Sequence, residues 1–301
     1  MEARFAQEQA KRQPANASDS SMRWSNSDRS SDLEDRRGVS AGGFGLPHLG
    51  IGGVLILLVL SLVFKRDFFQ LLSTGSSGTG TVQSRPVNDA REEPEVRFIS
   101  FVLDDAQRTW EGIFQQEGRQ YRHAKLVLFR DAVDSACGMA QSATGPFYCP
   151  EDEKVYIDLG FFDELKQRFG APGDFAQAYV LAHEIGHHVQ KQLGTEGQVQ
   201  QAMGSNPRQR NELSVRMELQ ADCFAGVWGR AAGQRNILEA GDVDEGLRAA
   251  AAVGDDRLQK MATGQVNPDS FTHGSSEQRA QWFRQGMTQG TVGACNTFAV
   301  N

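Results

Sequence analysis

Two histidines and a glutamate in the order His-Glu-x-x-His are the residues whose types and spacing most directly indicate chemistry. They are His183, Glu184 and His187, and residues 174–193 around them read as a helix. Residues four apart lie on one face of a helix, so both imidazoles can bind one metal ion. Glu184 then lies near the open position of that metal, where it can take a proton from water. The pattern predicts a hydrolytic zinc site.

Context separates this motif from a helix that carries two histidines and a solvated glutamate by chance. The four residues before His183 are Tyr-Val-Leu-Ala, which indicates a buried helix. Polar side chains buried without partners are costly, so burial favours a metal site. Gly186, inside the helix, costs about 1 kcal/mol relative to alanine. It predicts the close approach of another backbone or of a substrate.

A catalytic zinc site also needs a third protein ligand. Residues 211–229 repeat apolar side chains at helical spacing, and Glu218 and Asp222 lie four residues apart on the same face. Two acids at this spacing are also common on a solvated face. Their apolar neighbours favour separate roles: Glu218 binds the metal, and Asp222 accepts a hydrogen bond from a ligand histidine. His188 and Asp222 remain alternative third ligands.

The His-Glu-x-x-His motif followed by Glu-x-x-Ala-Asp at residues 218–222 resembles the gluzincin metallopeptidases. The resemblance implies that Glu184 is the general base and that Asp222 supports His183. It implies three ligands for the zinc ion: His183, His187 and Glu218. We expect one zinc ion per chain.

Residues 272–279, Thr-His-Gly-Ser-Ser-Glu-Gln-Arg, resemble a Thr-His-Pro-x-x-x-x-Arg segment of membrane-associated gluzincins, with glycine in place of the proline. The resemblance implies that His273 and Arg279 face the substrate carbonyl. Ser275 and Gln278 form the pattern of a capping box at a helix start. His273 then precedes the helix and Arg279 lies in its first turn, where both are suitable donors to an oxyanion. The alternative is a loop histidine and an arginine with structural roles.

From residue 22 to the C-terminus the chain resembles a bacterial family of neutral zinc metallopeptidases. The matching segments include residues 22–24, 34–38, 145–150, 155–158, 183–188 and 272–279. Residues 1–21 fall outside this resemblance. One hypothesis is that translation begins at Met22 rather than at Met1.

Composition divides the chain into four regions. Residues 1–48 are rich in Ser, Arg, Asp and Gly, which predicts a disordered tail. Residues 49–64 are uncharged and apolar, and with the uncharged residues before them they reach the length of about 20 residues that a transmembrane helix needs. A buried core helix or a cleaved signal sequence is the alternative. Residues 65–95 predict a flexible linker, and residues 96–301 the catalytic domain.

The domain is predicted to be α+β and zincin-like, mostly helical with a small sheet. Strands are expected at residues 125–129 and 154–158, and residues 155–158 are placed at the sheet edge, where an extended peptide can add as another strand. Helices are expected at residues 98–114, 161–169, 174–193, 211–229, 242–262 and from 276 onward.

The four cysteines favour disulfides over a structural metal site, because none forms a Cys-x-x-Cys pair. Cys137 and Cys149 flank a loop and suit a local bridge, and Cys223 and Cys295 could then form the second. Other pairings and four reduced thiols are the alternatives. Disulfides favour an oxidising compartment. Positive charges on the two sides of the apolar segment are balanced, so the cysteines decide the predicted orientation.

We therefore expect a single-pass protein of the bacterial inner membrane, with a cytoplasmic tail and the catalytic domain on the periplasmic, extracytoplasmic side. The predicted function is a membrane-anchored zinc metallopeptidase acting on a peptide or protein substrate. The alternatives are a catalytically silent binding module and a zinc hydrolase acting on a non-protein envelope substrate. The net charge of −7 and the isoelectric point near 5.5 give no indication of nucleic-acid binding.

Overall fold

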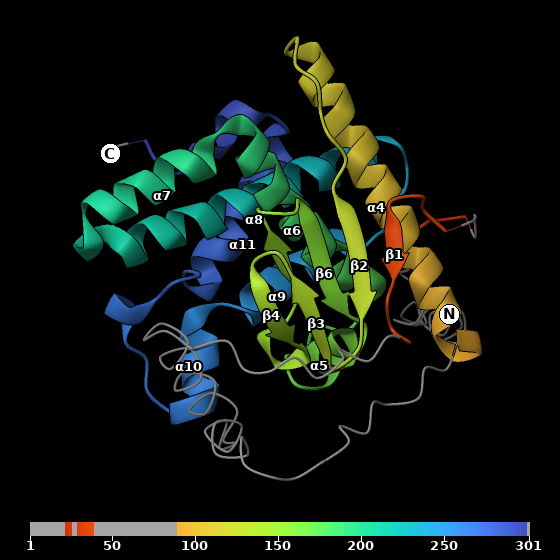
Figure 1. Cartoon of the computed structure of the whole chain (residues 1–301), viewed down its shortest axis with the longest axis horizontal. Helices are drawn as coiled ribbons and strands as arrows, with labels where there is room; N and C mark the ends of the chain where they lie inside the picture. The colour runs from red at the N-terminus through yellow and green to blue at the C-terminus, as the bar shows by residue number, and fades with distance from the viewer. Residues whose placement is uncertain (1–21, 26–28, 39–88, 300–301) are drawn as a thin grey trace, which may run out of the picture.

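The computed structural model describes residues 22–25, 29–38 and 89–299. These residues form a mostly helical domain with a small sheet, as the sequence predicts (Figure 1). The apolar residues 49–64 and most of the predicted linker lie outside the described residues. Among the residues that are described, no helix is both long and apolar enough to cross a membrane.

The sheet has four strands in the order β1 (Leu33–Asp35), β2 (Lys125–Phe129), β6 (Lys154–Asp158) and β5 (Phe147–Cys149). β1, β2 and β6 are parallel, and β5 is antiparallel to β6. The prediction that residues 155–158 form the edge is wrong, because β6 lies between β2 and β5. β1 and β5 are the edge strands, and each has three residues, too few for strand alternation to be recognised in the sequence.

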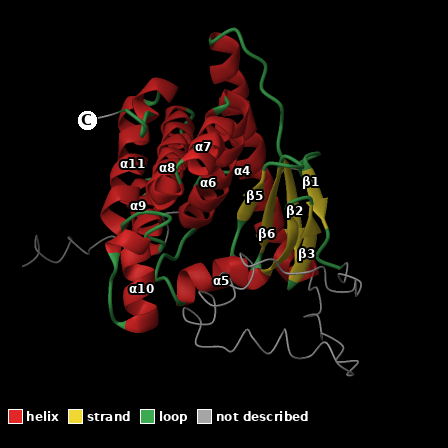
Figure 2. Cartoon of the chain, turned by 60° about the vertical axis from the view of Figure 1, so that its left-hand side comes forward, coloured by secondary structure: helices red, strands yellow, loops and turns green. Residues whose placement is uncertain are grey.

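The two faces of the sheet pack against different layers, because successive strand residues point to opposite faces. One face packs on the helices, with α6 beside it (Figure 2). It contributes four side chains to the main core: Leu126, Leu128, Val155 and Ile157. On the other face, Val127 and Tyr156 pack with the hairpin of β3 (Ala132–Ser135) and β4 (Gly138–Gln141).

β1 comes from the segment that composition assigned to a disordered tail. Its residues pair with residues 126–128 of β2, and Met22 and Trp24 pack into the main core. The prediction of disorder is therefore wrong for residues 22–25 and 29–38. A short polar strand gives no local signal, because its stability comes from a partner far along the chain.

The pairing of β1 with β2 also constrains the predicted membrane topology. β1 precedes the apolar residues 49–64 in the sequence, and β2 follows them. Strands that share backbone hydrogen bonds must lie on the same side of a bilayer. A cytoplasmic tail up to residue 48, with residues 96–301 on the opposite side, does not agree with this pairing.

The helices that carry the predicted site lie where the sequence places them. α6 (Asp174–Leu193) has the predicted bounds, and α8 (Arg210–Gln234) and α11 (Ser276–Gln289) differ little from expectation. α4 (Asp89–Gln116) begins earlier than predicted, within residues assigned to the linker, and α5 (Gly160–Gln167) precedes α6. α11 begins with the predicted capping box of Ser275 and Gln278.

The single helix predicted at residues 242–262 is instead two helices, α9 (Asp242–Ala252) and α10 (Asp255–Thr263). At the break, a Cβ on Gly254 would lie 2.3 Å from the backbone nitrogen of Ser276. The start of α11 therefore packs directly on the break. α7 (Thr195–Ser205) was not predicted. Short 3-10 turns occur at Ser142–Thr144, Pro207–Gln209, Pro268–Ser270 and Val292–Cys295.

α8 and α11 approach each other through two glycines. A Cβ on Gly226 of α8 would lie 2.1 Å from the backbone oxygen of Phe283, and a Cβ on Gly286 of α11 would lie 1.9 Å from that of Cys223. Neither position has room for a methyl group. The two backbones are therefore in contact, which fixes the helix of Glu218 relative to α11.

We expect Gly286→Ala to lower the free energy of unfolding by about 1–3 kcal/mol, the usual cost of overpacking a core, because the added methyl group would push α11 away from α8. Gly112→Ala in α4 is the control, since its Cβ would meet no atom within 4 Å. There, alanine should stabilise the helix by about 1 kcal/mol. Denaturant unfolding of both variants measures the difference, and equal effects would contradict the prediction.

Two disulfides have the predicted pairing. Cys137–Cys149 joins the turn between β3 and β4 to the end of β5, with Cα atoms 5.8 Å apart. Cys223–Cys295 joins α8 to the C-terminal segment, with Cα atoms 5.5 Å apart. The first bridge attaches β5 to the hairpin of β3 and β4. The second attaches α8, the helix that carries Glu218, to the C-terminal segment.

Candidate metal centre

α6 and α8 bring the predicted metal ligands together in the interior of the domain. His183 and Glu184 lie in the buried part of α6, only 6% and 7% exposed. A Cβ on Gly186 would lie 2.9 Å from the backbone oxygen of Ala221, which confirms the predicted close approach of a second backbone. This contact lets α8 present Glu218 directly to the histidines of α6.

The three predicted ligands fit a zinc ion. Nε2 of His183 lies 3.2 Å from Oε2 of Glu218, and Nε2 of His187 lies 3.5 Å from Oε1 of Glu218. The ligand atoms of all three residues lie within 4.8 Å of one another. Tetrahedral zinc with bonds of about 2.1 Å holds its ligand atoms about 3.4 Å apart. Two imidazoles and one carboxylate at these separations form a donor set of the catalytic type.

Hydrogen bonds orient both imidazole rings. Nδ1 of His183 lies 2.8 Å from Oδ1 of Asp222, as the sequence predicts. Nδ1 of His187 lies 2.9 Å from Oε1 of Gln190, whose amide donates to the backbone oxygen of Met217. A ring that donates from Nδ1 keeps the lone pair of Nε2 for a metal. Gln190 was not predicted, although its position one helical turn after His187 was a signal.

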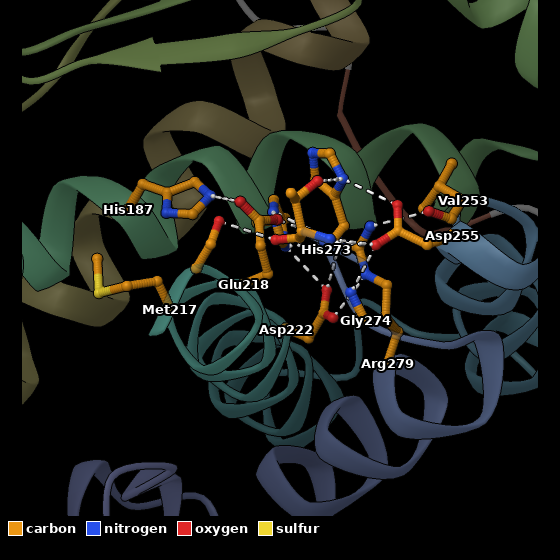
Figure 3. A network of polar contacts seen from close by, with 12 residues as sticks. His187, Met217, Glu218, Asp222, Val253, Asp255, His273, Gly274 and Arg279 are labelled. Atoms are coloured by element: carbon orange, nitrogen blue, oxygen red, sulfur yellow. Dashed lines mark hydrogen bonds and ion pairs between the residues drawn. The ribbon is translucent and has the colours of Figure 1, made fainter. Parts of the chain in front are cut away.

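Arg279 is packed against Asp222 (Figure 3), and its Nη2 also lies 3.5 Å from Nε2 of His183 and 4.0 Å from Oε2 of Glu218. Its side chain is 5% exposed, and Nε and Nη2 donate to the two oxygens of Asp222 at 2.8 and 2.9 Å. Tyr179, which was not predicted, also donates to Asp222 and lies 3.3 Å from Nη2 of Arg279. The two hydrogen bonds to Asp222 favour a supporting role for Arg279, and its direct contact with an oxyanion stays a prediction.

His273 lies at the entrance to the site, with half of its side chain exposed (Figure 3). Its Nδ1 lies 3.1 Å from Oδ1 of Asp255. Oδ2 of Asp255 accepts hydrogen bonds from the backbone nitrogens of Thr272, His273 and Gly274 at 2.7, 2.7 and 3.1 Å. Asp255 was missed because it was placed inside a longer helix. The sequence Gly-Asp-Asp at residues 254–256 was the available signal of a helix start.

Charges in the site favour a bound cation. Burial lowers the pKa of His183, but Asp222 outweighs this effect and the pKa rises to about 10. Burial acts to raise the pKa of Glu218, yet His187 and His183 hold it well below its usual range. Burial also raises the pKa of Glu184, with the same histidines opposing the shift. A raised pKa suits a carboxylate that takes up a proton and returns it.

His188, an alternative third ligand, points away from the metal centre. Its Nδ1 lies 2.9 Å from the hydroxyl of Tyr148 in β5, and its Nε2 lies 2.6 Å from the backbone oxygen of Arg122. The side chain therefore joins α6 to the edge strand. Glu218 is the carboxylate that the structure places between the two ligand histidines.

An open cleft of about 790 Å³ reaches the ligands and Glu184. Its walls come from β5 and the loop before it, from α5 and from α7, α8 and α10. Much of the lining is apolar and includes Phe147, Tyr148, Phe169, Val199, Met203 and Leu258. The cleft therefore combines a polar floor, formed by the candidate metal ligands, with apolar walls.

A His-Glu-x-x-His helix with a glutamate from a second helix, open to a cleft, defines a zinc-hydrolase type of site. Residues 22–298 match the family described as "Putative neutral zinc metallopeptidase", and the chain belongs to this family. It is 46% identical over 292 residues to "Uncharacterized protein YpfJ" of Escherichia coli (strain K12), covering 92% of this chain and 99% of that protein. It is 44% identical over 194 residues to "Uncharacterized protein Mb2605" of Mycobacterium bovis, covering 60% and 64%. No solved structure matches the chain.

Proposed function

We propose that this protein is a zinc metallopeptidase that hydrolyses peptide bonds. The observation that carries the proposal is the convergence of His183, His187 and Glu218, with Glu184 beside them at the floor of an open cleft. Zinc, when bound, supplies a Lewis acid that polarises a carbonyl and makes water more acidic. The family to which the chain belongs supports the same class of activity.

The side chains around the ligands have separate roles in the proposed reaction. Glu184 takes a proton from the attacking water and returns it to the leaving amine. His273 donates a hydrogen bond to the carbonyl oxygen as negative charge develops there. Burial lowers the pKa of His273, but its hydrogen bond with Asp255 and the negative charges of Glu218 and Asp255 together outweigh this effect and raise the pKa, which favours the protonated donor. Arg279 acts indirectly, by holding Asp222 in place.

The proposed substrate is an extended peptide segment. Within the described sheet, β5 pairs with β6 along one edge and has no strand along the other. An extended peptide can add to such an edge by backbone hydrogen bonds. We therefore propose that β5, and not residues 155–158, pairs with the substrate peptide, since β5 lines the cleft. The apolar walls favour substrates with apolar side chains near the scissile bond.

Membrane attachment through residues 49–64 and a location outside the cytoplasm remain predictions. The two disulfides support an oxidising compartment. The pairing of β1 with β2 adds the requirement that residues 33–35 share the compartment of the catalytic domain.

Metal binding is the first test of the proposal. We expect the purified protein to bind about one zinc ion per chain and to lose peptide hydrolysis when a chelator removes the ion. Glu218→Gln should lower zinc affinity sharply, because the amide replaces a charged ligand with a neutral one. Metal analysis after graded chelator challenge, with hydrolysis of a peptide library in the same samples, measures both effects.

Glu212→Gln is the matched control for this test. Glu212 lies on the same helix but is exposed at its start, where it pairs with Arg216. The control should retain zinc and activity. Full zinc occupancy of Glu218→Gln under chelator challenge would show that Glu218 is not the third ligand.

A further inference from the structure

A second group of carboxylates lies at the N-terminal end of α6, nine residues before His183. Asp174 is the first residue of α6, and Asp242 and Glu245 belong to the first turn of α9. Their oxygens lie within 4.8 Å of one another. Asp242 is fully buried, and Glu245 is 8% exposed. Buried like charges at this separation are stabilised either by a positive partner or by the uptake of a proton.

The backbone nitrogen of Met22 contacts one member of this group, Asp174. It donates to Oδ2 of Asp174 at 2.8 Å, and the buried Met22 side chain anchors the segment in the core. Arg23 continues the attachment, because its backbone nitrogen donates to the backbone oxygen of Ile237 at 2.7 Å. Within the described part of the chain, Oδ1 of Asp174 and Oδ1 of Asp242 are buried with no hydrogen-bond partner. A peptide nitrogen has one hydrogen and cannot serve these oxygens as well.

The fold holds the carboxylates in this arrangement. Oε2 of Glu245 accepts from the backbone nitrogen of Phe175 at 3.1 Å, and Oδ2 of Asp242 accepts from that of Glu239 at 2.7 Å. A Cβ on Gly173 would lie 1.3 Å from Oε1 of Glu245, so only glycine leaves room for this carboxylate.

The ionised forms of these carboxylates are destabilised. Burial and the neighbouring Asp174 raise the pKa of Glu245 to about 7. Burial also raises the pKa of Asp174 and of Asp242. A cation bound among them would be stabilised by all three.

We propose that Asp174, Asp242 and Glu245 form a binding site for the free α-ammonium group of Met22, so that the functional chain begins at Met22. An α-ammonium group brings a positive charge and three hydrogens, where a peptide nitrogen brings one hydrogen and no charge. The two additional hydrogens equal in number the two unpartnered oxygens of the group. A metal ion fits this group less well, because an N–H donor already points at Asp174. The family match, which begins at residue 22, supports the same start.

This contact would tie the beginning of the chain to the beginning of the helix that carries His183 and His187. The acidic group is also placed favourably for α6, because negative charge stabilises a helix N-terminus. The start of the chain would thereby help to hold the metal-binding helix in position. This role is separate from the proposed peptidase activity, since it concerns stability and the identity of the first residue.

The test begins with the protein made from its natural gene with its own upstream region. Intact-mass measurement and N-terminal sequencing should find a chain that starts at Met22 with an unblocked amine. Two full-length forms are then compared in the same detergent: one starting at Met22, and one purified through an affinity tag on Met1. The form that starts at Met22 should have the higher Tm, by about 5 °C.

The decisive comparison is the effect of Asp242→Asn on the Tm of the two forms. Asp244→Asn is the control, because Asp244 is exposed on the same helical turn. Asp242→Asn should lower the Tm of the Met22 form. In the tagged form, it should leave the Tm unchanged or raise it, because an unpaired buried charge is removed. Asp244→Asn should have little effect in either form.

Several results would overturn the proposal. A natural chain that starts at Met1, or that carries a blocked amine at Met22, would exclude a free ammonium group. Equal Tm values for the two forms, or equal effects of Asp242→Asn in both, would remove its interaction with the acidic group. A rise in Tm on adding calcium that Asp242→Asn abolishes would assign the group to a metal ion instead. None of these results depends on peptide hydrolysis.

Discussion

Replacement of Glu184 with glutamine is expected to lower kcat for peptide hydrolysis by about 10²–10⁴-fold, the range for loss of a general base. The amide keeps the size of the side chain, but it cannot accept a proton from water. Because Glu184 lies beside the ligands and is not one of the three that converge, zinc binding should remain. The KM for a peptide substrate should change little, since the lost interaction belongs to the transition state.

Zinc content, Tm and kcat should be measured on the same preparation of Glu184→Gln. Glu212→Gln again serves as the control, because it makes the same chemical change at an exposed position of α8. Turnover of Glu184→Gln within a factor of ten of the unmodified protein would remove Glu184 from the role of proton acceptor. Inactivity of both the unmodified protein and the variant on a broad peptide library would favour the binding-module alternative.

The residues of the candidate metal centre could be identified from sequence because helical spacing places the two members of each pair on one face. His183 and His187 lie four residues apart on one helix, and Glu218 and Asp222 lie four apart on another. Each pair is therefore fixed before any tertiary contact is known. Gly186 added a tertiary clue, and the structure shows that it admits the backbone of α8.

Features that depend on distant partners could not be predicted in this way. β1 is a short polar segment that becomes a strand only beside β2. Asp255 reaches the His273 loop only because the chain breaks at Gly254 and packs on α11. The role of Tyr179 requires Asp222 to approach from α8. In each case the partner lies tens of residues away or at a break that periodicity does not reveal.

The resemblance of residues 272–279 implied one role for both His273 and Arg279, but their surroundings differ. Arg279 is buried and bonded to Asp222, whereas His273 is half exposed beside the cleft. Capping by Ser275 and Gln278 was correctly predicted, because it depends on local sequence. The contacts of the arginine with Asp222 depend on the position of α8, which the local sequence does not give.

Arg279→Ala is therefore expected to act mainly on stability and metal binding. Removing one partner of a buried ion pair typically costs about 3–5 kcal/mol, because the other charge is left unpaired. Asp222 would then hold His183 less firmly, and loss of such a supporting contact lowers metal affinity by about 10–100-fold. Thermal unfolding and chelator competition measure these two effects. Arg279→Lys should recover part of the stability, since it keeps the charge but not the paired hydrogen bonds.

His273→Ala should give the opposite pattern. Its side chain is half exposed and pairs with Asp255, whereas Asp222 is bonded to the ligand His183. The Tm and the zinc affinity of His273→Ala should therefore remain close to those of the unmodified protein. Loss of a donor to the oxyanion should lower kcat by about 10²–10³-fold with little change in KM. Normal turnover in His273→Ala would remove the oxyanion role and leave the metal centre intact. Normal zinc affinity and Tm in Arg279→Ala, combined with a large loss of kcat, would instead restore the direct role that the sequence first suggested.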